Sequence, residues 1–318
     1  MAQRPRLGKK LFKSLLPIVL LLVAALVAAM YFIVHGITRP TRQAYLVTPQ
    51  SFSAISGSAL KVTDETWTNR DGTPARGWLL RGSEGAPAVV FLHRYGGDRS
   101  WLFNLGIKLN ETSNFTILWV DLRGHGKDPQ VEWSSFGNFE EGDLLDALAF
   151  LRGVKSPGQN QLVGKRMGVY GVELGAYAAL RAASQDPTIQ VLVLDSVPGS
   201  ADELVNSAVI SELGVSAEVV LSLARLGVRG YFFGNYANKT SCELAAALKT
   251  QQALLLAGAD DGSLRESTSA LKSCFPNQDN LTMKTDLPLT GFTVSSATGE
   301  QGEAYDRPVI DFFVEKLP

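Results

Sequence analysis

The sequence predicts an α/β fold: a mostly parallel central sheet with helices on both faces, preceded by one transmembrane helix. Three observations support this prediction. A long uncharged run, Ser14 to Val34, stands near the N-terminus. Short continuous apolar runs then alternate with helix-like stretches, which is typical of strands buried on both faces. Glycine-containing motifs follow several of these runs, as expected at the ends of parallel strands.

The N-terminal run is long enough to cross a bilayer, because a helix rises about 1.5 Å per residue and the hydrocarbon core is roughly 30 Å thick. Residues 1–13 form a basic segment, 14–34 the anchor and 35–58 a juxtamembrane linker. The basic segment holds five cations, against Arg39 and Arg42 after the run: Arg4, Arg6, Lys9, Lys10 and Lys13. The positive-inside rule therefore predicts a signal anchor with a cytoplasmic N-terminus and a periplasmic or extracellular domain.

The alternative is a cleavable signal peptide ending near residues 27–29, although the apolar run continues to Val34. With 30 Lys plus Arg against 31 Asp plus Glu, the net charge of -1 gives no reason to expect a nucleic-acid partner. The two cysteines, Cys242 and Cys274, lie where an outward compartment would let them pair, but the sequence leaves their pairing open.

Residues 59–318 are predicted to form one domain. Residues 60–64 and 78–80 read as an antiparallel lead-in pair around the turn at 71–72, and five buried strands follow: 88–92, 116–120, 167–170, 191–194 and 253–256. Residues 144–151 have helical periodicity behind an acidic first turn. Two helical patterns, around 203–210 and 217–226, interrupt the alternation of strands and helices. We expect residues 200–241 to form a lid over the carboxyl ends of the strands.

Three motifs follow predicted strands in order: Phe91 to Gly97, Asp121 to Asp128, and Gly171-Val172-Glu173-Leu174-Gly175. In this order and at this spacing they resemble the α/β-hydrolase superfamily, particularly its lysophospholipase-like and serine-aminopeptidase-like branches. The resemblance covers roughly Leu60 to the C-terminus. A doubly wound nucleotide-binding fold is disfavoured, because no glycine-rich phosphate loop follows the first buried strand.

The resemblance places Glu173 where the family's nucleophile elbow, G-x-S-x-G, carries serine. It implies Asp261, with Asp260 as neighbour, as the triad acid, and matches Gln301 to the histidine base. All three histidines of the chain, His35, His93 and His125, precede the elbow. A glutamine amide does not titrate near neutral pH and so cannot act as the base.

The resemblance also places the oxyanion hole between the loop His93-Arg94-Tyr95 and the backbone of Leu174. We expect Arg94 and Glu173 to form a charge-assisted bond that fills this hole; alternatively, Arg94 points to solvent. His93 and His125 are expected to brace loops rather than to catalyse. No metal site and no cofactor are predicted.

The leading functional hypothesis is a membrane-anchored pseudoenzyme that binds or scaffolds. The alternative is an active esterase- or peptidase-like hydrolase that uses Glu173 as nucleophile or base; a third possibility is a partner chain that supplies histidine. Apolar lid residues suggest an apolar or acyl-containing small molecule as guest, or serve only to pack the lid: Val205, Val209, Ile210, Leu213, Val219, Leu221 and Leu223. The bilayer is the other expected partner, through residues 14–34.

Overall fold

An eight-stranded, mostly parallel sheet forms the centre of the computed structural model, which describes residues 7–56, 61–258, 262–294 and 297–317. The strands lie in the order β1-β2-β4-β3-β5-β6-β7-β8. Strand β2 runs antiparallel to both of its neighbours, β1 and β4, and all other neighbouring strands are parallel. The bounds are β1 Val62–Thr68, β2 Pro74–Leu80, β3 Ala86–Leu92, β4 Thr116–Val120, β5 Val163–Val172, β6 Ile189–Asp195, β7 Gln252–Gly258 and β8 Leu281–Leu287. The predicted lead-in pair and the parallel sheet are confirmed.

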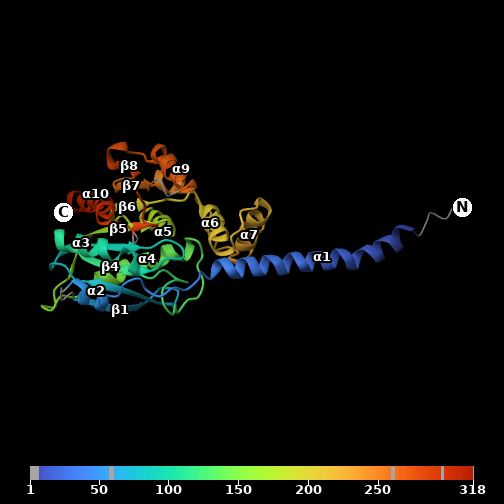
Figure 1. The fold of residues 1–318 in the computed structure, drawn as a ribbon, viewed down its shortest axis with the longest axis horizontal. Helices are drawn as coiled ribbons and strands as arrows, with labels where there is room; N and C mark the ends of the chain where they lie inside the picture. Colours follow the sequence, from blue (N-terminus) through green and yellow to red (C-terminus); the bar gives the residue numbers. More distant parts are fainter. Residues whose placement is uncertain (1–6, 57–60, 259–261, 295–296, 318) are drawn as a thin grey trace.

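Helices cover both faces of the sheet (Figure 1). The α4 and α5 side chains share one apolar cluster with alternate residues of β3, including Val90 and Leu92. The α3 and α10 side chains share a second cluster with Val89 and Phe91 of the same strand. This alternation across β3 follows from the two-residue period of a strand. The bounds of these helices are α3 Phe103–Ser113, α4 Asn138–Gly153, α5 Leu174–Ala183 and α10 Gly299–Lys316.

Helix α1 (Leu7–Thr38) leaves the domain as a long projection (Figure 1). Its part from Lys13 to Thr38 is long and apolar enough to cross a membrane, and only 6% of its most apolar window is buried inside the protein. The last turn differs, because Val34 and Ile37 are buried in the core of the domain. The Ile37 carbonyl also accepts a hydrogen bond of 2.5 Å from the Tyr95 hydroxyl. Helix α1 is therefore built into the domain at its C-terminal end.

The segment expected to be a linker, 35–58, packs in part against the domain where the structure describes it. Helix α1 continues to Thr38, and a short helix, α2, spans Pro49–Ser56. Between them the Tyr45 hydroxyl donates to Asp121 at 2.7 Å, and the Leu46 amide donates to the Ser100 hydroxyl at 2.9 Å. Its apolar residues are too scattered for a periodic signal, yet Tyr45, Val47 and Phe52 pack on the second cluster, while Leu46 and Ile55 are exposed.

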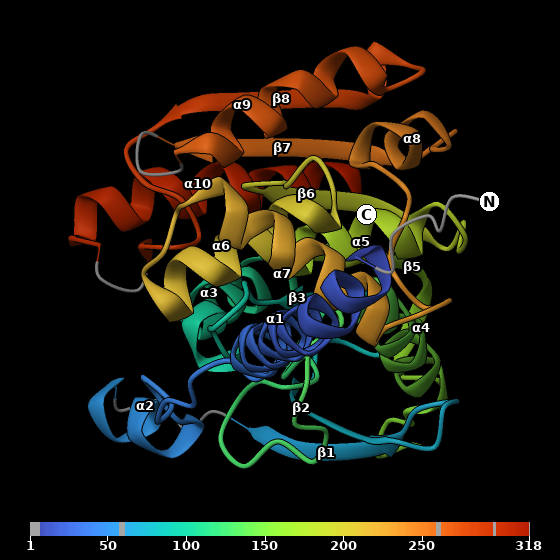
Figure 2. The same cartoon turned by 90° about the vertical axis from the view of Figure 1, so that its right-hand side faces the viewer.

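The predicted lid lies between β6 and β7 and consists of α6 (Ala201–Leu213) and α7 (Glu218–Tyr231), followed by the short helix α8 (Ser241–Ala246). Figure 2, which looks toward α1 along its length, shows α6 and α7 beside this helix. Cys242 of α8 forms a disulfide with Cys274, the last residue of the 3₁₀ helix η2 (Leu271–Cys274), with the Cα atoms 5.2 Å apart. The structure thus decides the pairing that the sequence left open.

Candidate functional site

A sharp turn between β5 and α5 holds Glu173. Its φ of 47° lies in the left-handed region, which is uncommon for a residue with a side chain. The flanking glycines are required by space: a Cβ on Gly171 would come within 2.6 Å of Gly175 and Ala176, and one on Gly175 within 2.4 Å of the Leu92 carbonyl. The predicted elbow geometry is present, with glutamate at its tip.

The Glu173 carboxylate is held by two backbone N–H groups. Its Oε2 accepts from the Tyr95 amide at 2.9 Å, and the carboxylate also accepts from the Leu174 amide. The side chain is only 3% exposed. Burial raises the pKa of Glu173 to about 7, although the nearby charge of Arg94 and the two N–H groups act in the opposite direction. The carboxylate therefore occupies the point on which two backbone donors converge.

Arg94 is close to this carboxylate but does not bond to it. Its guanidinium lies over the rings of Trp101 and Phe292, 4.5 and 5.2 Å from their centroids, and Nη1 donates to the Tyr95 carbonyl at 2.8 Å. Both expectations for Arg94 are wrong: the direct bond to Glu173 is not formed among these described residues, and the side chain is half-buried rather than turned to solvent. Two aromatic faces and one carbonyl hold the guanidinium instead.

Of the two other predicted triad positions, only Gln301 is described by the structure, and it does not line the cavity at Glu173. Asp260 and Asp261 lie outside the described residues, although Gly262, just after them, lines the same cavity as Glu173. Gln301 is exposed in the first turn of α10, where its Oε1 accepts from the Thr298 amide and hydroxyl and so caps the helix.

Phe292 is the site residue that sequence reasoning missed. It lines the cavity beside Glu173, in the segment between β8 and α10 that precedes Gln301, the residue matched to the histidine base. The sequence signal available for it was its position: Gly291-Phe292 comes shortly after an alternating strand pattern. A phenylalanine ring cannot accept a proton, so this part of the cavity wall supplies no base.

Asp195, at the end of β6, fixes both the elbow and the segment that carries Phe292. Its carbonyl accepts from the Glu173 amide at 2.9 Å, and its Oδ2 accepts from the Gly291 amide at 2.6 Å. The same oxygen accepts from the Tyr305 hydroxyl, which also bonds to the Tyr170 hydroxyl. This buried carboxylate therefore positions the turn.

The two domain histidines brace loops. His93 Nε2 accepts from the Leu122 amide at 3.1 Å, so Nδ1 carries the proton and donates to the Arg94 carbonyl at 2.7 Å. His125 Nδ1 lies 2.8 Å from the Arg123 carbonyl. Burial lowers the pKa of His93 to about 4 and that of His125 to about 3, so both are neutral at pH 7. Within the described chain no cluster of three metal-ligating side chains occurs.

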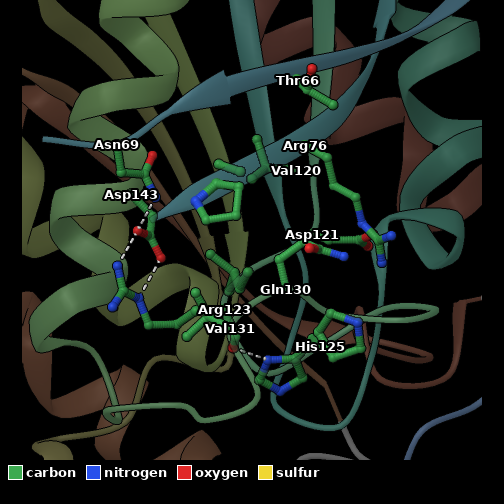
Figure 3. Close-up of a pocket in the computed structure, with 14 residues that line it drawn as sticks. Thr66, Asn69, Arg76, Val120, Asp121, Arg123, His125, Gln130, Val131 and Asp143 are labelled. Atoms are coloured by element: carbon green, nitrogen blue, oxygen red, sulfur yellow. Dashed lines mark hydrogen bonds and ion pairs between the residues drawn. The ribbon is translucent and has the colours of Figure 1, made fainter. Parts of the chain in front are cut away.

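Glu173 opens onto a cavity of about 250 Å³ under the lid, with Ser207 and Ser211 of α6 on its wall. A larger cavity of about 440 Å³ lies elsewhere, beside β2 and the end of β4 (Figure 3). Its charged groups are already engaged, because Arg123 pairs with Asp143 and Arg76 with Asp121. We take the smaller cavity as the candidate site, since the elbow and its converging donors are there.

Solved structures similar to this chain identify the fold as that of the α/β hydrolases. An esterase from Pyrococcus furiosus matches with a TM-score of 0.63 at 21% identity, covering 88% of this chain and 100% of its own. A hyperthermophilic esterase from Pyrobaculum calidifontis matches at 0.55 and 15% identity, covering 93% of both chains. Esterase LipW from Mycobacterium marinum matches at 0.58 and 18%, covering 83% of both.

No protein-family model matches the sequence, and no curated protein matches it. At these identities the similarity establishes the architecture and leaves the activity to be argued from the site. The class of protein is thus defined: an α/β-hydrolase-fold domain joined to an apolar helix that has the length to span a membrane.

Proposed function

We propose that this protein is a membrane-anchored, non-catalytic α/β-hydrolase-fold protein that acts by binding or scaffolding. The observation that carries the proposal is the position of the Glu173 carboxylate on the amides of Tyr95 and Leu174. In a hydrolase of this fold these donors stabilise the oxyanion of the transition state. A resident carboxylate uses the donors itself and, when ionised, repels a second negative charge.

The surroundings of Glu173 support the same proposal. Hydrolysis through the elbow needs a base close to the attacking group, and Phe292 takes the place beside it. The chain has three histidines. His93 and His125 are buried in backbone hydrogen bonds, and His35 lies on the anchor helix, bonded to Arg39. None of the three lines the cavity at Glu173.

Anchoring through α1, with the domain on the outer side, is the second part of the proposal. The charge difference across the apolar run favours this orientation. The Cys242–Cys274 disulfide adds independent support, because disulfides persist in oxidising compartments such as the periplasm or the cell exterior.

For the ligand of the cavity we propose a small acyl-containing molecule. Ser207 and Ser211 offer hydroxyl groups to its polar end, and Leu264 and Phe292 offer apolar contact to the chain. The apolar lid residues support this ligand less than the sequence suggested, since Val205 and Val209 are buried in the core and Val219 is exposed to solvent.

The test is turnover of a panel of activated acyl esters by the full chain in a mild detergent, beside Glu173→Gln and Glu173→Ser. We expect all three proteins to show no turnover above the rate in buffer, because no histidine is among the described residues that line the site. Thermal unfolding of each variant serves as the control for folding. Turnover by the wild type that Glu173→Gln abolishes would overturn the proposal.

That second outcome would support the alternative function, in which Glu173 activates water as a general base. One observation favours it: a pKa of about 7 is close to the value that suits a general base at neutral pH. The two amide donors already bound to the carboxylate argue against it, since they stabilise the ionised form and thereby weaken it as a base.

A further inference from the structure

A groove lies between the anchor helix and the lid, separate from the cavity at Glu173. Its volume is about 410 Å³. One wall is formed by four residues of α1: Val27, Met30, Tyr31 and Val34. The other wall is formed by Gly227, Gly230 and Tyr231 of α7, and His35 and Arg39 lie at the end nearer the domain. The groove is thus apolar along its length and cationic at one end.

The position of the groove along α1 sets its depth in a membrane, if α1 anchors the chain as proposed. Residue 27 lies within the apolar run and Arg39 lies five residues beyond it. The helix from residue 27 to its end at Thr38 rises roughly 17 Å, comparable to one leaflet of a hydrocarbon core about 30 Å thick. A groove at that depth opens to acyl chains at one end and to headgroups at the other.

Helix α7 carries a second apolar face that the domain does not cover. Val219 and Leu226 on the helix, and Phe233 just after it, are 73%, 61% and 88% exposed. Their spacing of seven residues places them on one side, away from the buried Ala224 and Val228. Both α6 and α7 lie on the side from which α1 leaves the domain (Figure 1). This exposed face therefore belongs to the helix that packs against α1.

The cation at the polar end has no acidic partner in the described part of the chain. Arg39 Nη1 donates to His35 Nδ1 at 2.9 Å, which leaves its other N–H groups available. The arginines of α7 differ, because Arg225 pairs with Glu218 and Arg229 with Asp202. A guanidinium with free donors at headgroup level matches the geometry of a phosphate.

We propose, on the basis of the anchoring proposed above, that this groove holds one phospholipid of the leaflet next to the domain. Its phosphate binds Arg39, and one acyl chain lies along α1 between Val27 and Val34, against the glycines of α7. Gly227 sets the spacing of the two helices, since a Cβ there would come within 2.6 Å of Val34. A Cβ at Gly230 would meet no atom within 4 Å, so this glycine leaves the groove open.

The test measures phosphatidylglycerol retained by the full chain after transfer from phosphatidylcholine/phosphatidylglycerol nanodiscs to a mild detergent, counted by native mass spectrometry. Gly230→Leu fills the groove, and Arg39→Gln removes the phosphate contact. Gly142→Leu is the matched control for the first, because Gly142 is also helical with open space at its Cβ. Arg166→Gln is the control for the second, since Arg166 is exposed near the start of β5.

We expect one tightly retained phosphatidylglycerol per wild-type chain, its loss in Gly230→Leu, and an affinity about tenfold weaker in Arg39→Gln, the usual size of one charge-assisted contact. Both controls should retain the lipid, and glycerol phosphate should not displace it. No retained lipid, or equal retention in all variants, would overturn the inference.

Flotation of the chain with phosphatidylcholine vesicles at alkaline pH separates this inference from the anchoring on which it rests. A chain that does not float overturns both the anchoring and the lipid site. A chain that floats but retains no specific lipid leaves the anchor standing and removes only the lipid site.

Discussion

Replacing Arg123 by methionine is expected to lower the free energy of unfolding by about 3–5 kcal/mol, the usual cost of removing one partner of a buried ion pair. Arg123 Nε donates to Asp143 at 2.7 Å and Nη2 donates to Asp71 at 3.0 Å. Asp143 is itself buried, and burial raises its pKa to about 6 even with the arginine present. Without the guanidinium, Asp143 remains as an uncompensated buried charge.

Chemical denaturation of the full chain in detergent, followed by tryptophan fluorescence, measures this change. The Arg123 guanidinium lies 5.0 Å from the centroid of the Trp133 ring, so the region has its own reporter. The double replacement Arg123→Met with Asp143→Leu is the matched control and should recover a large part of the loss. A single-variant loss below about 1 kcal/mol would contradict the assignment of Arg123 as a buried structural cation.

Removing the Cys242–Cys274 disulfide is expected to lower the free energy of unfolding by about 3–4 kcal/mol. The bridge closes a loop between residues 32 apart in sequence, and the expected loss follows from the chain entropy that such a loop removes from the unfolded state. The loop contains β7 and α9, and its ends are α8 and η2.

The measurement compares denaturation midpoints with and without a phosphine reductant, beside the variant with both cysteines changed to alanine. The reductant should destabilise the wild type and leave the double-alanine variant unchanged. Equal midpoints for the oxidised wild type and the double-alanine variant would contradict a structural role for the bridge.

Much of the fold could be predicted because its signals are local. The buried parallel strands appear as continuous apolar runs, and the turn at Glu173 appears as two glycines spaced around one residue. Strand β8, which no expectation covered, has the alternating burial of an edge strand in the sequence Leu-Thr-Met-Lys-Thr-Asp-Leu. That period-two pattern was readable, but its low apolar content resembles a loop.

The details of the site depend on contacts between residues that are far apart in the sequence, and local sequence patterns do not predict such contacts. Arg94 was expected either to bond to Glu173 or to point to solvent. No local sequence pattern indicates that the rings of Trp101 and Phe292 lie against its guanidinium. Gln301 was matched to the lost histidine on position alone, whereas the structure uses it as a helix cap. The continuation of α1 past residue 34 into the domain could not be predicted either. The buried residues of its last turn, Val34 and Ile37, are apolar like the run before them.

The central claim is that the Glu173 carboxylate rests on the amides of Tyr95 and Leu174, and a proton NMR titration tests it most directly. The full chain, labelled with ¹⁵N at tyrosine and leucine in detergent, gives amide signals for both residues. Tyr95→Phe identifies the tyrosine signal, because the new phenylalanine carries no label.

Since burial raises the pKa of Glu173 to about 7, its carboxyl is neutral below that pH and ionised above it. An ionised acceptor strengthens the hydrogen bonds that it receives. We therefore predict that the Tyr95 and Leu174 amide protons move downfield together as pH rises through about 7, and that Glu173→Gln abolishes the movement. Amide proton shifts that change neither with pH nor in Glu173→Gln would contradict the claim, because the two donors would then be free to bind an oxyanion.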